Sequence, residues 1–146
     1  MKKLVKYNLF VLSIFLLIGC QKEVDIKKLN NYWEIKKVEN PNGGVKEYTF
    51  NETIDFIEVE GDKGFRKKVK PQLDGTFLVT NDTEIFKISK EDGVYTINYS
   101  TQYANWKEEI EKLTDETLVV RNQVGLIYTY QKYENNFREI MEGKGD

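Results

Sequence analysis

The stretch Tyr95-Thr-Ile-Asn-Tyr99 alternates apolar and polar side chains with a period of two residues. This period places Tyr95, Ile97 and Tyr99 on one face of an extended strand and the polar side chains on the other. Such a pattern is typical of an antiparallel strand that covers a core on one side only. It is the clearest alternation in the chain, and it favours an all-β fold.

The same alternation recurs on both sides of this stretch. The other segments that carry it lie around Trp33 and Ile35, Tyr48 and Phe50, 53–60, 65–69, Phe77 and Val79, Phe86 and Ile88, 118–120 and 126–130. Within 53–60 the apolar face changes from Ile54 and Phe56 to Ile57 and Val59. This change predicts either a β-bulge or a strand covered on both faces.

Residues 105–113 fit two structures. Trp106, Glu108 and Ile110 alternate as in a strand, whereas Trp106, Ile110 and Leu113 recur at helical spacing. We favour the strand, because the segment leads into a natural hairpin at 113–118.

Turn signals separate these segments. They are found at 40–44, 61–64, Asp74-Gly75, Asn81-Asp82 and 91–93. Asp-Gly and Asn-Gly pairs supply the positive φ angles that tight hairpins need. Strands joined in this way predict an antiparallel up-and-down meander, which closes as a barrel or folds as a sandwich.

The first 19 residues have the composition of a secretory signal peptide. Three lysines lie among the first six residues, and an apolar run follows at 9–18. At about ten residues this run is shorter than the roughly 20 that a membrane-spanning helix needs. Leu17-Ile18-Gly19-Cys20 resembles the lipobox of bacterial lipoproteins, in which the cysteine sulfur receives a diacylglyceryl group and the chain is cut just before it.

Cys20 is the only cysteine of the chain, and histidine is absent. A single thiol forms no intramolecular disulfide, and without histidine it also lacks the usual partner for catalysis or metal binding. We therefore predict that Cys20 is lipidated. The residue after it, Gln21, is not the aspartate that retains enterobacterial lipoproteins at the inner membrane. This predicts an outer-membrane lipoprotein of the cell envelope, with the membrane face undetermined.

Charge and composition exclude several functions. Loss of the three lysines of the signal peptide leaves 19 of the 22 basic residues against 24 acidic ones, a net charge of −5. With no basic excess, nucleic-acid binding is disfavoured. Asp55, Glu58 and Glu60 lie on one predicted strand, but clusters of carboxylates are unavoidable with so many acids. We predict no enzyme activity, no cofactor and no metal site.

The mature domain resembles the lipocalin-like lipoproteins of Bacteroidetes-type bacteria, which are small barrels of the calycin kind. The resemblance lies in an opening strand with a tryptophan soon after a leucine (29–35), a Tyr-x-Phe strand (48–50), and a Leu-Thr-Asp-x-x-Leu phrase (113–118) before a closing Tyr-x-Tyr strand (128–130). The tryptophan lacks the glycine that usually stands two residues before it, since Asn31 occupies that position. The resemblance implies a lipocalin-like barrel and little about a ligand.

These observations divide the chain into four parts. They are a signal peptide at 1–19, a lipidated tether at 20–28, a lipocalin-like barrel at 29–133 and a polar tail at 134–146, which forms a short helix or is disordered.

Aromatic side chains are the candidate ligand-binding groups. Those expected to point into the barrel are Trp33, Tyr48, Phe50, Phe56, Phe86, Tyr95, Tyr99, Tyr128 and Tyr130. An eight-stranded barrel is either filled by its side chains or open to one small ligand, so two readings remain: the rings pack a core, or they line a cavity.

The segment 65–70 is predicted to be an edge strand protected by its basic side chains, with an anionic partner site as the alternative. The function indicated by the whole sequence is a lipid-anchored envelope protein that binds a small apolar or amphipathic molecule. The alternative is a non-enzymatic subunit that docks on another envelope protein.

Overall fold

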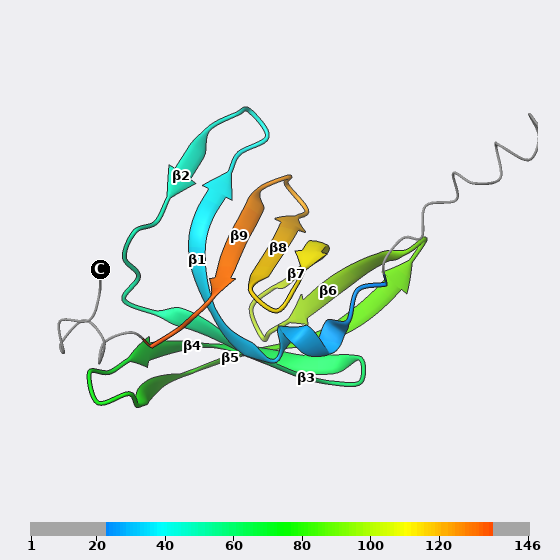
Figure 1. Cartoon of the computed structure of the whole chain (residues 1–146). Helices are drawn as coiled ribbons and strands as arrows, with labels where there is room; N and C mark the ends of the chain where they lie inside the picture. The colour runs from blue at the N-terminus through cyan, green and yellow to red at the C-terminus, as the bar shows by residue number, and fades with distance from the viewer. Residues whose placement is uncertain (1–22, 136–146) are drawn as a thin grey trace, which may run out of the picture.

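The computed structural model describes residues 23–135, which form an antiparallel β-sheet preceded by one short helical turn (Figure 1). Its elements are η2 (Ile26–Leu29), β1 (Asn31–Glu39), β2 (Val45–Glu47), β3 (Ile54–Glu60), β4 (Lys63–Pro71), β5 (Phe77–Glu91), β6 (Val94–Ser100), β7 (Asn105–Leu113), β8 (Thr117–Asn122) and β9 (Ile127–Lys132). The predicted all-β, up-and-down architecture is confirmed.

The sheet closes on itself. From β3 to β9 each strand pairs with the next one in the chain, and β1 pairs with β9 from Trp33 opposite Lys132 to Glu39 opposite Ile127. Eight strands therefore form a closed barrel. The ninth, β2, pairs only with the second half of β1, after β1 has separated from β3.

The barrel has two different ends. Because consecutive strands run in opposite directions, the turns at 61–62, 92–93 and 114–116 lie together at one end, which we call the base. The turns at 40–44, 101–104 and 123–126 lie at the other end, which we call the mouth. The tip of the β4–β5 hairpin at 72–76 extends away from the mouth, toward Tyr133 and Asn135. The η2 turn contacts β3 and β7 and covers the base (Figure 1).

Apolar side chains fill the barrel from the base upward. Leu29 of η2 and Trp33 of β1 are fully buried, and the Trp33 indole donates a hydrogen bond to the Leu29 carbonyl at 2.9 Å. The buried residues packed with them are Ile57, Val59, Phe86, Ile88, Ile97, Tyr99, Ile110, Leu118, Val120 and Tyr130. Burial of each large apolar side chain stabilises the fold by about 1.5–3 kcal/mol, so this cluster is the core of the protein.

Two ambiguous segments are resolved. Residues 105–113 form the strand β7, as favoured, with a bulge between Ile110 and Lys112. Strand β3 pairs with β4 without interruption, and both Ile54 and Asp55 are buried. The change of apolar face at 53–60 therefore marks a strand covered on both sides. On its outer side, the ring of Phe56 lies 4.8 Å from that of Tyr32.

Three expectations about strands are wrong. The pair Asn81-Asp82 is not a turn: it lies within the 15-residue strand β5, where 80–82 bulge out opposite Lys68. The basic segment 65–70 is not an edge, because β4 pairs with both β3 and β5. Residues 48–50 follow β2 and are not in a strand. Hydrogen bonding of neighbouring strands, which no single segment reveals, decides all three.

Several predictions fall on residues outside the described part of the chain: the signal peptide, Cys20 and the tail at 136–146. Within residues 23–135, no helix is both long and apolar enough to cross a membrane.

Candidate functional site

Charged side chains line the inner wall of the barrel near the mouth. In an antiparallel pair, residues directly opposite each other point to the same face. The register places Asp55 of β3 opposite Lys68 of β4, and Arg66 of β4 opposite Glu84 of β5. Glu108 of β7 lies opposite Ile97, whose side chain belongs to the core. Five ionisable groups therefore share the inner face.

These groups form two sets of ion pairs. The Arg66 guanidinium lies 2.5 Å from Glu84 and 3.5 Å from Glu108, and the Lys68 ammonium lies 2.5 Å from Asp55. Only 12% of the Arg66 side chain and 3% of the Asp55 side chain are exposed. A buried charge is tolerated only when it is paired, so the network explains how five charges fit inside a small barrel.

A stack of aromatic rings supports Arg66. The rings of Tyr99 and Trp106 are stacked at 4.9 Å, and Phe86 meets Tyr99 edge to face at 5.5 Å. The guanidinium of Arg66 lies 4.5 Å from the centre of the Tyr99 ring, in cation–π contact. Contact with Tyr99, whose ring is itself packed against Phe86 and Trp106, helps to hold Arg66 in the wall.

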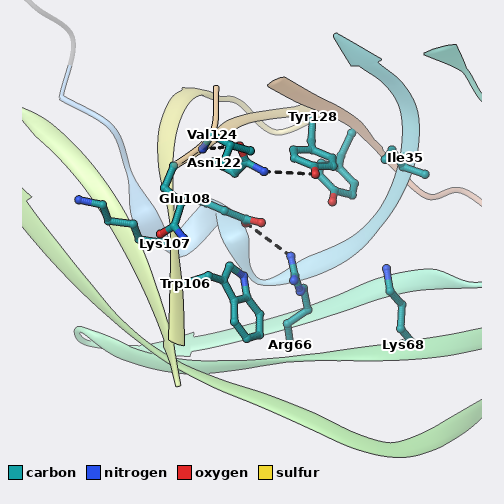
Figure 2. A pocket seen from close by; sticks show the side chains of 11 residues that line it. Ile35, Arg66, Lys68, Trp106, Lys107, Glu108, Asn122, Val124 and Tyr128 are labelled. Carbon is teal, nitrogen blue, oxygen red and sulfur yellow. Dashed lines mark hydrogen bonds and ion pairs between the residues drawn. The ribbon is translucent and has the colours of Figure 1, made fainter. Parts of the chain in front are cut away.

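Above this network the barrel is open. A pocket of about 440 Å³ lies at the mouth between β1, β4 and β7–β9 (Figure 2). Its lining residues are Ile35, Arg66, Lys68, Trp106, Lys107, Glu108, Asn122, Gln123, Val124, Tyr128 and Tyr130. The Asn122 amide donates a hydrogen bond to the Tyr128 hydroxyl at 3.4 Å, which holds the two side chains together at the rim.

Burial controls the protonation of these groups. It raises the pKa of Glu108 above the usual value, although the charge of Arg66 opposes the shift. Burial likewise raises the pKa of Tyr130 and that of Tyr99. The Tyr99 hydroxyl has no hydrogen-bond partner of regular geometry, but it lies close enough to Glu108 to lower the pKa of that carboxyl. Both tyrosines therefore remain protonated and keep an O–H group to donate.

The arrangement is suited to binding. It offers flat aromatic surface from Trp106 and Tyr128, hydroxyl and amide groups for hydrogen bonding, and charges of both signs. Among residues 23–135 no group of histidine, cysteine, aspartate or glutamate side chains is arranged to hold a metal ion. The carboxylates of 55–60 do not converge, because Asp55 is buried while Glu58 and Glu60 are exposed.

The predicted aromatic residues are distributed over the whole barrel. Tyr128 and Tyr130 line the mouth pocket. Trp33, Phe86 and Tyr99 are buried in the core, and Tyr95 packs against it. The interior placement expected for Tyr48, Phe50 and Phe56 is wrong. Tyr48 and Phe50 lie outside the strands, with Phe50 77% exposed, and Phe56 lies on the outer side of β3, against Tyr32.

Sequence reasoning missed the charged half of the site. Arg66 and Lys68 alternate with Phe65, Lys67 and Val69, so they were the polar face of a segment that was expected to lie at an edge. Arg66 lies opposite Ile57, whose side chain belongs to the core, so this face turns inward. Trp106 and Glu108 alternate in the sequence, but an inward glutamate can be recognised only when its partner Arg66 is placed beside it.

Comparison with known proteins identifies one family model and two solved structures that are similar to this chain. A family model described as a lipocalin-like domain matches residues 29–120. Two crystal structures are similar. One is a lipocalin-like protein from Bacteroides uniformis ATCC 8492, with a TM-score of 0.46 and 11% identity over 73% of this chain and 99% of that one. The other is an uncharacterised protein from Bacteroides eggerthii DSM 20697, with a TM-score of 0.45 and 13% identity over 70% of this chain and 98% of that one.

No curated protein matches the sequence. The family model alone spans well over half of the 146 residues, and its match begins at Leu29, the residue that closes the base, and extends to Val120 of the core. The chain therefore belongs to the lipocalin-like domain family.

Proposed function

We propose that this protein is a lipid-anchored lipoprotein of the cell envelope, at the outer membrane, whose barrel mouth binds a small amphipathic molecule. The anchor is the diacylated Cys20, and its support is the signal peptide and lipobox of residues 1–20. Binding is the role, and catalysis is not part of it.

The division of the barrel into a filled base and an open mouth carries the ligand-binding proposal. The buried apolar cluster around Trp33, Phe86 and Ile88 packs the interior below the pocket, so a ligand cannot enter deeply. The pocket of about 440 Å³ above them is within the size range of small-molecule sites. Both alternatives for the aromatic residues therefore apply, each to one end of the barrel. Aromatic rings pack the core at the base, and others line the cavity at the mouth.

The chemistry of the pocket favours an amphipathic ligand over a wholly apolar one. An apolar molecule would cover Arg66, Lys68 and Glu108 without replacing the water that solvates them, and burial of unsatisfied polar groups is costly. A ligand with one flat apolar part can stack on Trp106, while its polar part exchanges hydrogen bonds with the charged wall.

Native mass spectrometry of the full-length protein, purified gently from its own host, tests this proposal. We expect a retained small molecule whose mass identifies its class. The variant Trp106→Ala should lose it, because the main apolar wall of the pocket is removed. The variant Phe50→Ala should keep it, because Phe50 is exposed and does not line the pocket. A bare chain mass in repeated preparations would contradict ligand binding.

One observation favours a second candidate, an interaction subunit that docks on an envelope protein. A shallow groove of about 700 Å³ on the outer face of β3–β5 contains Phe65 and Ile85, and Ile85 is 62% exposed. The second function replaces the first if two results are obtained. The chain mass is bare, and Ile85→Asp abolishes a cross-linked product that the wild type forms with a protein partner in membranes.

A further inference from the structure

We infer that the base of the barrel faces the membrane and that the mouth opens away from it. The inference rests on the proposed lipid anchor at Cys20 and adds to it the orientation of the binding site. It means that the ligand enters from the aqueous phase and not from the acyl chains of the bilayer.

The chain just after the anchor makes polar contacts with the base. The Glu23 carboxylate accepts a hydrogen bond from the Lys90 ammonium at 2.8 Å and another from the Tyr95 hydroxyl at 3.2 Å. Lys90 and Tyr95 face each other in the last pairs of the β5–β6 hairpin, next to its turn. The Lys90 ammonium also lies 4.7 Å from the centre of the Tyr95 ring.

The residues that follow Glu23 extend this attachment. Val24 and Ile26 pack against the core cluster, and Leu29 is fully buried within it. The Asp25 side chain accepts a hydrogen bond from the backbone N–H of Lys27 at the start of η2. Residues 23–28, expected to be part of a free tether, are therefore held against the base, as Figure 1 shows for the blue segment before β1.

Few residues lie between the proposed anchor and the attached segment. Two residues separate Cys20 from Glu23, and three steps of an extended chain span about 10 Å at most. A strand of seven residues such as β6 spans roughly 20 Å. A lipid on Cys20 therefore keeps the base near the bilayer surface, and the mouth lies farther away by about the length of a strand.

The charge of the base determines how close this approach is. The turns at this end and the strand residues next to them include six acidic residues, Glu60, Asp62, Glu91, Asp92, Asp115 and Glu116. Charged groups are costly to transfer into an apolar medium, so the base does not insert into the bilayer. The protein is held by its acyl chains with the base at the lipid surface.

Energy transfer between the protein and labelled lipid tests the orientation. The mature lipidated protein is reconstituted into phosphatidylcholine vesicles that contain an acceptor on the lipid headgroup. Because the lipid occupies the thiol of the only cysteine, one added cysteine accepts the donor dye selectively. The paired variants are Glu60→Cys at the base and Asn42→Cys at the mouth, both at exposed positions. We expect severalfold higher transfer from residue 60.

A longer tether is the matched control. About 12 Gly and Ser residues inserted between Lys22 and Glu23 behave as a flexible coil and alter no contact of the barrel. The insertion should abolish most of the difference between the two labels while the protein stays on the vesicles.

The outcomes separate the two proposals. Equal transfer from both positions, or higher transfer from residue 42, would overturn the orientation and leave the anchor intact. A protein that does not sediment with the vesicles would show that the lipid anchor is wrong, and the orientation would fall with it.

Discussion

Single residues acquire their roles in this barrel from partners on neighbouring strands. Lys68 was expected on a protected edge, yet its ammonium pairs with the buried Asp55 of β3. Arg66 lies between Glu84 and Glu108, which are separated from it by 18 and 42 positions. A sequence examined segment by segment shows a charge but not its partner. The charged half of the site was therefore not predictable from the sequence, although every one of its residues was visible there.

The buried Glu108 predicts a pH dependence of stability. Burial raises the pKa of Glu108 in the folded state above its unfolded value near 4.5, so the folded state keeps the proton to higher pH. The contribution of Glu108 to the free energy of unfolding therefore falls as pH rises from about 4.5 through its folded pKa, by at most about 1.4 kcal/mol per pH unit.

Urea unfolding between about pH 4 and pH 8 measures this effect. The difference in unfolding free energy between the wild type and Glu108→Gln should decrease through this window and then level off. The control is Glu109→Gln, which removes an exposed carboxylate from the same strand. A difference that stays constant with pH for Glu108→Gln would contradict the raised pKa.

Gly64 is predicted to tolerate no side chain. A Cβ atom at this position would lie 2.5 Å from the Phe86 ring and would also contact the Glu58 carbonyl oxygen. Gly64→Ala should therefore destabilise the fold by about 1–3 kcal/mol, the usual cost of overpacking. Thermal unfolding gives the readout, and Gly44→Ala, whose Cβ would meet nothing closer than 3.7 Å, should change it little. Equal effects of the two substitutions would show that both the Phe86 ring and the β3 backbone at Glu58 move aside.

Among the strands, those with strong local patterns were predicted well. Residues 94–100 and 105–113 became β6 and β7 because their alternation agrees with the pairing on both sides. The Asn81-Asp82 pair misled the prediction, since turn-forming residues also suit a bulge. The pairing between β4 and β5 changes register: Lys67 lies opposite Thr83, whereas Val69 lies opposite Val79. Residues 80–82 of β5, which lie between these two pairs, remain within one strand. The pairing partner, which lies outside the segment, decides between a turn and a bulge.

The hairpin between β5 and β6 depends on its two-residue turn. Asp92 and Gly93 both have positive φ, 50° and 81°, as a type I′ turn requires. Gly93→Ala should cost about 1–2 kcal/mol, because the left-handed conformation brings Cβ close to the following carbonyl oxygen. Gly93→Asn should cost less, because asparagine tolerates this conformation. Chemical unfolding of both variants measures the difference, and the turn assignment fails if alanine is the better tolerated of the two.

For the molecule as a whole, the sequence predicted the closed barrel but not its division into base and mouth. Alternation identifies an inner face for each strand, and the resemblance of the two chain ends to lipocalin-like proteins indicates closure. The depth of the cavity depends on the summed volume of inward side chains such as Trp33 and Phe86. It also depends on η2, a four-residue turn within a segment that was expected to be tether.

Attachment to the membrane is predicted to require the thiol of Cys20. Cys20→Ser should leave the protein as an unprocessed precursor or as a soluble chain, because no sulfur remains for the diacylglyceryl group. Membrane fractionation combined with the intact mass measures both outcomes. Two or more acyl chains hold a protein stably at a bilayer, so a processed Cys20→Ser protein that still fractionates with membranes would show that the anchor lies elsewhere.

The seam between β1 and β9 has a consequence for how the chain folds. It pairs residue 33 with residue 132, whereas every pairing from β3 to β9 joins strands that are adjacent in sequence. The entropy lost on closing a loop grows with its length, and folding slows when contacts are distant in sequence. The seven-stranded meander should therefore assemble first, with zipping of the seam as the late step. Mutations in the seam would then act mainly on the unfolding rate.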